Sequence, residues 1–383
     1  MISTKLLGVA CVIAGLAETA SAAKPLFVQK DIFIAGLDGV CQYRIPAIVT
    51  TNKGTLVAVC DARVDRPGDA PNNIDQVVKR SLDRGKTWTR MKVIVDFPGN
   101  EAAGDPTLLV DRKTGTIWMF YAYAIPKPDV KPFGRVLWVH AVTSDDDGVS
   151  WSKPIDVTAA FKKPEWSAIV TAPGMGIQTR AGRLLVPCYS RTGDRWSSHL
   201  SYSDDHGKTW HIGGPAPLKT NECQVVELVD GTLMLNMRSK RGKGCRAVAT
   251  STDGGKTWSE AIDATTLVEP VCQGSFIRYT DRRDGYAKDR VLFANPASRK
   301  RENMTVRLSY DEGKTWPIAK VLHTGPAAYS CPTILADGTI AVFYERGDQS
   351  AYETITFARF NLEWLTDGKD CLRRERSCKR AAQ

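Results

Sequence analysis

The segment Ser81-Leu82-Asp83-Arg84-Gly85-Lys86-Thr87-Trp88 is one of five copies of the pattern Ser-x-Asp-x-Gly-x-Thr/Ser-Trp. The other four copies begin at Ser144, Ser203, Ser251 and Ser309. An Asp side chain in such a segment accepts hydrogen bonds from nearby backbone amides, and Gly adopts a positive φ at little cost. The pattern therefore predicts five tight turns, each closed by a Trp side chain, whose residues are structural and not catalytic.

The spacing of the copies indicates the architecture. They begin 63, 59, 48 and 58 residues apart, which suits a four-stranded antiparallel sheet with its connections. Short alternating runs such as 136–142 and 339–344 are typical of strands, and sustained helical periodicity is absent. We therefore expect an all-β, six-bladed β-propeller with four-stranded antiparallel blades. The blade around 330–360 lacks the turn pattern.

The two ends of the chain differ from its middle. Lys5, an apolar run over 6–16 and the small residues Ala20-Ser21-Ala22 predict a signal peptide over 1–22. No later run reaches the roughly 20 apolar residues of a membrane-spanning helix. We expect the propeller over 23–366 and a basic tail over 367–383, and hence a secreted or periplasmic protein without membrane insertion. A monomer is the default expectation.

The charge balance favours anionic partners. The formal net charge is +10, and the segment 371–383 is itself strongly basic. No nucleic-acid-binding motif accompanies this charge, so we expect no nucleic-acid partner; a basic surface that aids solubility or an acidic glycan ligand explains it better.

The cysteines and histidines predict neither a metal site nor a cofactor. The chain has 10 Cys, and nine follow the predicted signal peptide without CxxC spacing, so most are expected to be buried apolar side chains. Cys371 and Cys378 are a candidate disulfide, because they close a short loop in an exported chain. The five His show no ligand spacing.

The turn pattern resembles the Asp boxes of bacterial-type exo-sialidases (neuraminidases), although non-enzymatic propellers such as sortilin-type receptors carry it too. Tyr43-Arg44-Ile45-Pro46-Ala47 makes the resemblance more specific, because it matches the Phe/Tyr-Arg-Ile-Pro motif near the mature N-terminus of sialidases. The resemblance covers nearly all of the chain between the signal peptide and the tail.

The resemblance implies that three arginines bind the carboxylate of sialic acid. The matching positions are Arg44, Arg238 in Leu-Asn-Met-Arg, and Arg307 just before the fifth turn. Guanidinium groups suit this task because they stay charged and grip a carboxylate through paired hydrogen bonds.

The resemblance also implies a tyrosine nucleophile. Sialic acid carries its carboxylate on the anomeric carbon, so a neutral phenol avoids the repulsion that an acidic nucleophile would meet. Tyr329 matches the late tyrosine of the family, and Glu222 matches the glutamate that acts as its base. Tyr344 is a rival nucleophile, although the family pattern makes Glu345 the useful residue there, as a carboxylate that orients Arg44.

The acid is expected on the loop after the strand that ends in Cys60-Asp61-Ala62-Arg63. Asp69 is the best match, with Asp65 and Asp75 as competitors. Arg63 resembles the arginine that meets the 4-hydroxyl of the sugar. Asp105, in Gly-Asp-Pro-Thr, resembles a residue near the N-acetyl group.

Together these residues predict hydrolysis of terminal sialic acids from glycoproteins, glycolipids and oligosaccharides, with retention and without a cofactor. A trans-sialidase or an intramolecular trans-sialidase would share all of these residues. A non-catalytic sialic-acid-binding propeller would lack the tyrosine, the glutamate or the loop aspartate, and all three are present.

Overall fold

The computed structural model describes residues 23–131 and 133–374, and nearly all of its regular structure is β-strand. Within these residues, helix is limited to α1 (Thr158–Phe161), α2 (Leu362–Leu365) and the 3-10 turn η1 (Arg282–Asp284). The all-β prediction is confirmed. None of the described helices has the length and apolar character needed to cross a membrane. The predicted signal peptide over 1–22 lies outside the described residues.

The strands follow one another in antiparallel runs along the chain. The first two runs are β2 (Gln42–Thr50), β3 (Leu56–Arg63), β4 (Ile74–Ser81) and β5 (Lys92–Val95), and then β6 (Ala102–Val110), β7 (Ile117–Pro126), β8 (Arg135–Ser144) and β9 (Ile155–Asp156). A parallel bridge between Ile74 and Ala102 joins these two runs into one sheet. The short β11 (Gly174–Met175) pairs in parallel with β6.

The middle of the chain forms two further sheets. One contains β10 (Ala168–Thr171), β13 (Leu184–Thr192), β14 (Arg195–Ser203) and β15 (His211–Ile212), with β12 (Ile177–Gln178) paired to β13. The other contains β16 (Thr220–Glu227), β17 (Leu233–Ser239), β18 (Cys245–Ser251) and β19 (Ile262–Val268).

The last sheet joins the two ends of the described chain. It contains β20 (Ser275–Thr280), β21 (Arg290–Pro296), β22 (Glu302–Ser309), β23 (Ile318–Ile334), β24 (Ile340–Arg346), β25 (Thr354–Phe360) and β1 (Phe27–Ile34). The long β23 pairs with β22 through its first half and with β24 through its second half. Strand β1 pairs with β25, so the N-terminal strand completes a sheet that is otherwise built from the C-terminal part of the chain.

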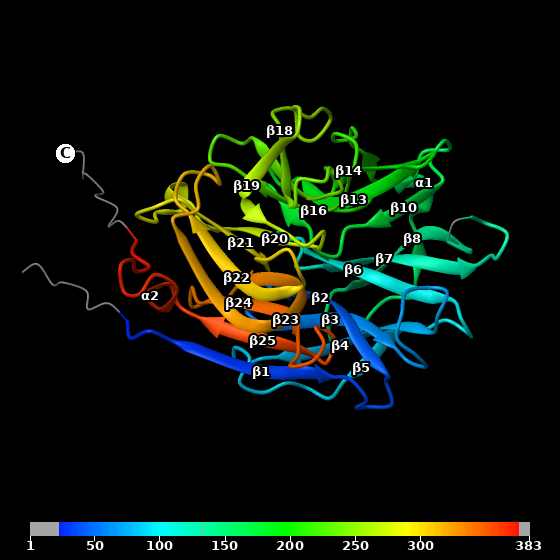
Figure 1. Cartoon of the computed structure of the whole chain (residues 1–383), viewed down its shortest axis with the longest axis horizontal. Coiled ribbons are helices and arrows are strands. Elements are labelled where there is room, and N and C mark those ends of the chain that lie inside the picture. Colours follow the sequence, from blue (N-terminus) through cyan, green and yellow to red (C-terminus); the bar gives the residue numbers. More distant parts are fainter. Residues whose placement is uncertain (1–22, 132, 375–383) are drawn as a thin grey trace, which may run out of the picture.

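The first strands of successive runs contact one another. Strand β2 contacts β6 and β23, and β20 contacts β16 and β23. In Figure 1 the labels β2, β6, β16 and β20 lie near the middle, whereas β1, β5 and β18 lie toward the rim. Residues far apart in sequence therefore meet near the middle of the molecule.

All five Ser-x-Asp-x-Gly segments form the expected turn at the end of the third strand of a run. In the first, the amide of Thr87 donates to the Asp83 carboxylate (2.9 Å) and the amide of Gly85 donates to the Ser81 hydroxyl (2.8 Å). Hydrogen bonds from Thr87 lower the pKa of Asp83 to about 2. Gly85 has φ +86°, and a Cβ there would lie 2.2 Å from the Phe357 ring, so the turn also needs Gly for close packing.

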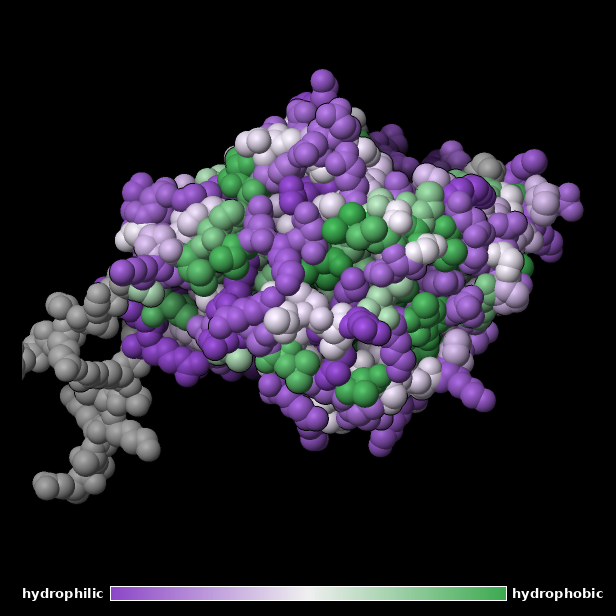
Figure 2. Space-filling view, turned by 90° about the horizontal axis from the view of Figure 1, so that it is seen from below, coloured by the Kyte–Doolittle hydropathy of each residue, from purple (hydrophilic) through white to green (hydrophobic). Residues whose placement is uncertain are grey.

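The apolar core lies between facing sheets, as the alternation of apolar residues along each strand dictates. Between the second and third runs, for example, Phe120, Val139, Ile169 and Val186 are fully buried together. On the face shown in Figure 2, the apolar surface is broken into separate patches among hydrophilic residues.

Most described cysteines are buried, as expected: Cys60, Cys188, Cys223, Cys245, Cys272 and Cys331. The partner proposed for Cys371, Cys378, lies outside the described residues. The first part of the predicted tail packs on the fold, because Asp370 is buried and accepts two 2.9 Å hydrogen bonds from Arg290. The folded part of the chain thus continues beyond residue 366.

Candidate active site

Two cavities lie at opposite ends of the first strands of the runs. One, of about 230 Å³, is lined by residues at or near the starts of these strands, such as Arg44 of β2 and Glu222 of β16. The other, of about 650 Å³, is lined by residues at or near their ends, such as Thr50 and Glu227. We call the first cavity the active-site pocket and the second the rear cavity.

The active-site pocket concentrates charge. Its lining contains five arginines and four acids, together with two tyrosines: Arg44, Arg63, Arg135, Arg238, Arg301, Asp61, Asp69, Asp105, Glu222, Tyr189 and Tyr329. Of the nine catalytic and substrate-binding residues predicted from the sequence, seven line this pocket. Glu345 lies directly behind it, and Arg307 lies elsewhere.

Glu345 holds both Arg44 and the backbone of the tyrosine segment. It is fully buried at the end of β24, and its carboxylate accepts from Arg44 Nε at 2.7 Å and from Arg44 Nη2 at 3.3 Å. The same carboxylate accepts from the amides of Ile45 (2.8 Å) and Tyr329 (2.9 Å). A buried carboxylate with this many donors is a rigid anchor, so Arg44 and Tyr329 keep a fixed relative position.

Tyr329, Glu222 and Arg238 form a compact polar group. The Tyr329 hydroxyl lies 2.5 Å from Glu222 Oε1, and Arg238 Nη1 donates to Glu222 Oε2 (2.8 Å) and to the Tyr329 hydroxyl (3.0 Å). Desolvation by burial and the Glu222 carboxylate raise the pKa of Tyr329 well above its usual range, which Arg238 partly offsets. The phenol of Tyr329 is therefore protonated at neutral pH. It can act as a nucleophile only if the adjacent Glu222 carboxylate takes its proton.

Arg307, the third arginine expected from the sequence, does not line this pocket. It lies two residues before the end of β22, where its Nη1 donates to Asn295 (2.9 Å). The Asp-box turns follow the third strand of each run, whereas the active-site pocket lies at the opposite end of those strands. A residue just before such a turn is therefore at the wrong end of its strand, and the prediction is corrected.

Arg301 occupies the place expected for Arg307. It immediately precedes β22 and lines the active-site pocket. Its Nη1 donates to the Tyr352 hydroxyl (2.6 Å), and its guanidinium lies 5.6 Å from the centre of the Tyr329 ring. The Arg44 guanidinium lies 4.1 Å from the centre of the Tyr352 ring. Tyr352, which the sequence did not single out, thus holds two of the arginines together.

Asp69 lies at the rim, on the loop between β3 and β4. Its side chain is 75% exposed, and its Oδ1 accepts from Arg63 Nη2 at 2.7 Å. Desolvation raises the pKa of Asp69, but Arg63, Arg44 and Arg135 outweigh it, so the pKa is lowered overall. Arg135 also donates to the carbonyl of Ala70 and so holds the loop next to Asp69.

The competitors of Asp69 and Tyr329 lie outside the active-site pocket. Asp75 sits in β4, and desolvation together with Asp96 raises its pKa to about 7. Neither Asp65 nor Asp75 is among the described residues that line the pocket. Tyr344 is fully buried, and its hydroxyl accepts from Gln29 of β1 (2.8 Å). The geometry thus favours Asp69 and Tyr329.

Asp61 and Asp105 form the acidic floor of the pocket. Asp61 Oδ1 accepts from Gln76 Nε2 (2.7 Å) and from the Asp105 amide (3.1 Å). Desolvation raises the pKa of Asp105 well above its usual range, and Asp61 and Glu222 raise it further. Asp61 was missed by the sequence analysis, although side chains two apart on a strand share a face, so it had to point the same way as Arg63.

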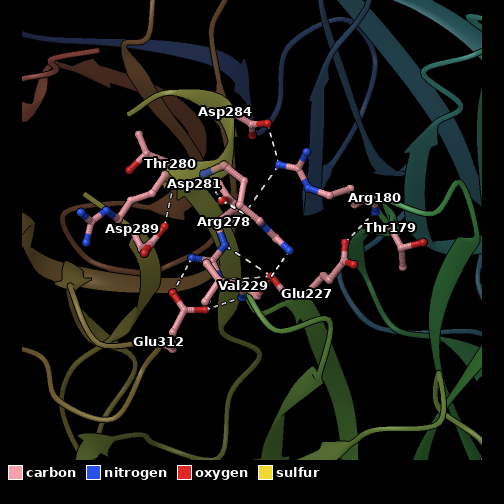
Figure 3. A network of polar contacts seen from close by, with 12 residues as sticks. Thr179, Arg180, Glu227, Val229, Arg278, Thr280, Asp281, Asp284, Asp289 and Glu312 are labelled. Carbon is pink, nitrogen blue, oxygen red and sulfur yellow. Dashed lines mark hydrogen bonds and ion pairs between the residues drawn. The ribbon is translucent and has the colours of Figure 1, made fainter. Parts of the chain in front are cut away.

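The rear cavity has charged side chains too, and most of its arginines form ion pairs. Arg180 pairs with Asp284 (2.6 Å), and Arg278 pairs with Glu312 (Figure 3). Arg283 pairs with Asp281. Arg112 also lines this cavity, where its Nη2 donates to the backbone carbonyls of Gln178 and Thr179. No tyrosine lines this cavity among the described residues. The rear cavity therefore lacks the hydrogen-bonded tyrosine and carboxylate of the active-site pocket.

Comparison with known proteins identifies the family of the chain. Residues 54–342 match the family of the BNR repeat-like domain. A sialidase of Micromonospora viridifaciens is 38% identical over 89% of this chain, which spans 55% of that protein. An exo-alpha-sialidase of Aspergillus fumigatus is 30% identical, and the alignment covers 86% of each chain.

A solved structure supports the same relationship. The Hadza microbial sialidase Hz136 is 37% identical, with a TM-score of 0.81 over 88% of this chain and 69% of its own. At this identity and overlap, both fold and family are shared, and the all-β sheets described above are arranged as a β-propeller. The chain therefore belongs to the sialidase family, with a BNR repeat-like domain over most of its length.

Proposed function

We propose that the chain is an exo-α-sialidase that releases terminal sialic acids from glycoproteins, glycolipids and oligosaccharides with retention. The observation that carries the proposal is the Tyr329, Glu222 and Arg238 group, which lies beside Arg44 and Arg301 in one pocket. A phenol hydrogen-bonded to a carboxylate and flanked by arginines suits a substrate with a carboxylate on its anomeric carbon.

Arg44, Arg238 and Arg301 bind the carboxylate in this proposal. Each of the three lines the active-site pocket, and a planar guanidinium can grip a carboxylate through paired hydrogen bonds. Arg63 meets the hydroxyl side of the sugar, and Asp105 lies on the side of the N-acetyl group.

The first chemical step forms a covalent glycosyl-tyrosine. The Tyr329 oxygen attacks the anomeric carbon while Glu222 takes the phenol proton, and the bond to the glycosidic oxygen breaks as Asp69 protonates that oxygen. Substrate binding also weakens the hold of Arg238 on Glu222, because the substrate carboxylate competes for the same cation.

The second step restores the enzyme. Asp69, now ionised, removes a proton from water as the water oxygen attacks the anomeric carbon. The Tyr329 oxygen leaves and takes back its proton from Glu222, and the anomeric configuration is retained after two inversions.

Product analysis with 3′-sialyllactose tests the proposal and separates its alternatives. Free sialic acid and lactose support hydrolysis. A 2,7-anhydro sugar would identify an intramolecular trans-sialidase, and transfer to added lactose would identify a trans-sialidase. Binding without any product would identify a non-catalytic sialic-acid-binding propeller. This outcome would be unexpected, because Tyr329, Glu222 and Asp69 are all in the pocket.

We also propose that the sheets form six blades of four strands. Four runs of four strands support this count. In the last sheet, β20, β21, β22 and the first half of β23 follow one another as a fifth set of four, and the second half of β23, β24, β25 and β1 follow as a sixth. A signal peptide over 1–22, a catalytic domain over 23–366 with a basic tail, export and a monomeric state complete the proposal. N-terminal sequencing of the exported protein and light scattering would test these points.

A further inference from the structure

A groove of about 470 Å³ adjoins the active-site pocket on the same end of the molecule. It is lined by Phe133, Arg191, Asp194, Arg195, Trp196, Leu218, Lys219 and Lys240. These residues come from the loop before β8, the turn between β13 and β14, the approach to β16 and the end of β17. The active-site pocket also lies at the starts of the first strands and the ends of the second strands, so both open at one end.

Two contacts link the groove to the pocket. The Trp196 ring centre lies 5.2 Å from that of Tyr189, which lines the pocket. The Arg135 guanidinium, which holds the loop next to Asp69, lies 5.5 Å from the centre of the Phe133 ring. In the proposed function the leaving group is protonated by Asp69. The groove therefore lies on the side where the rest of the glycan departs.

The groove carries an excess of positive charge. Four cationic side chains face one acid, Asp194. Arg195 approaches Asp194 at 3.9 Å, but both side chains are largely exposed, so this pair contributes little. Arg191, Lys219 and Lys240 form no ion pair with any of the residues that the structure describes. A neutral sugar would not require these charges, whereas an anionic sugar would be attracted by them.

The aromatic side chains provide a surface for a sugar ring. Phe133 is 39% exposed, and its ring centre lies 6.3 Å from that of Trp196. The Arg191 guanidinium lies 5.6 Å from the Phe133 ring centre, which keeps this planar cation at the aromatic surface. A ring carrying a carboxylate could thus place its apolar face on the aromatic pair and its charge on Arg191.

We propose that this groove binds a second sialic acid, the residue to which the terminal one is attached in an oligosialyl chain. The inference rests on the proposed exo-sialidase function and adds a substrate class to it. The groove takes no part in bond breaking. It increases the affinity for substrates whose leaving group is itself a sialic acid.

The test compares kcat/KM for α2,8-linked disialyllactose and for 3′-sialyllactose. The groove variant carries Arg191→Gln, Lys219→Gln and Lys240→Gln. Because exposed charge contacts are individually weak, we expect about a tenfold loss with disialyllactose and less than about a twofold change with 3′-sialyllactose. Raising the salt concentration should likewise reduce the preference of the unmodified protein for disialyllactose over 3′-sialyllactose.

A matched control removes the same charge at the other end of the molecule. Lys86, Lys208 and Lys256 are exposed residues of three Asp-box turns, and their replacement by Gln should leave the ratio of the two substrates unchanged. An unchanged ratio in the groove variant, or an equal loss with both substrates, overturns the proposal. A larger loss with a sulfated sialyllactose than with disialyllactose would assign the groove to sulfated sugars and overturn it as well.

The outcome also distinguishes the groove from the catalytic proposal. If the unmodified protein releases no sialic acid from either substrate, the proposed function fails. Calorimetry then tests whether the groove binds a second sialic acid. It compares the Kd of disialyllactose for the Tyr329→Phe protein with and without the groove substitutions. We expect about tenfold weaker binding with the substitutions, and equal Kd values would refute the second subsite.

Discussion

The exchange of one predicted arginine for another gives the most direct test of the active site. Arg301 lies before β22 at the pocket, and Arg307 lies near the far end of the same strand. We compare Arg301→Lys with Arg307→Lys. Each substitution keeps the positive charge and removes the planar pair of donors, so the two variants differ chiefly in location.

The magnitude follows from the hydrogen bonds at stake. Arg301 Nη1 is used by Tyr352, and Lys at this position would keep a point charge but lose the fork that can grip a carboxylate. A hydrogen bond to a charged group contributes about 1.5–3 kcal/mol. We therefore expect kcat/KM for sialosides to fall about tenfold to 150-fold.

The assay uses an aryl sialoside and its methyl ester, with thermal unfolding as a check on folding. If Arg301 binds the carboxylate, the preference of the unmodified protein for the acid over the ester should shrink in Arg301→Lys. A purely structural role would lower both rates and leave their ratio alone. Arg307→Lys should keep kcat/KM within about twofold and lose about 1 kcal/mol of stability with its bond to Asn295. The opposite pattern would refute this placement of the carboxylate site.

Further substitutions probe the remaining roles. Tyr329→Phe should lose activity by several orders of magnitude, and a normal rate in this variant would exclude Tyr329 as the nucleophile. Tyr344→Phe should stay active, with a free energy of unfolding about 1 kcal/mol lower. Asp69→Ala should slow single-turnover cleavage of sialyllactose about 10²- to 10⁴-fold and that of an activated aryl sialoside far less, and Asp75→Ala should show no such difference between substrates. Desolvation raises the pKa of Asp69, and Arg63 is the cation that lowers it most, so Arg63→Gln should raise the Asp69 pKa. Because Asp69 must be protonated to act as the acid, the decrease of kcat/KM for sialyllactose at alkaline pH should begin at a higher pH in Arg63→Gln. An unchanged pH profile would show that this decrease is caused by another group.

The turns and the first arginine could be predicted because their determinants are local. The Asp83 carboxylate accepts hydrogen bonds from residues within four positions of itself, and the same eight-residue pattern forms the same turn in five places. Arg44 is marked by its own motif at the start of β2. No long-range information is needed to place either feature in its strand.

The error at Arg307 arose from treating proximity to a turn as proximity to the site. Each Asp-box turn closes the third strand of a run, and the active-site pocket lies at the other end. The start of a third strand is therefore the place to look for pocket residues. This rule identifies Arg301 before β22, and it also identifies Arg135 at the start of β8, which the motif comparison omitted.

Tyr352 shows where such rules stop. It lies in the loop between β24 and β25, in the part of the last sheet that lacks the turn pattern, and no motif surrounds it. Its hydroxyl contacts Arg301, 51 residues away, and its ring contacts Arg44 from the opposite end of the chain. The pairing of β23 with β22 and β24, together with the contacts of β2 with β23 and β24, brings these three residues together. The spacing of two carboxylate-binding arginines thus depends on a loop whose sequence gives no sign of that role, because its contacts exist only after the sheets have assembled.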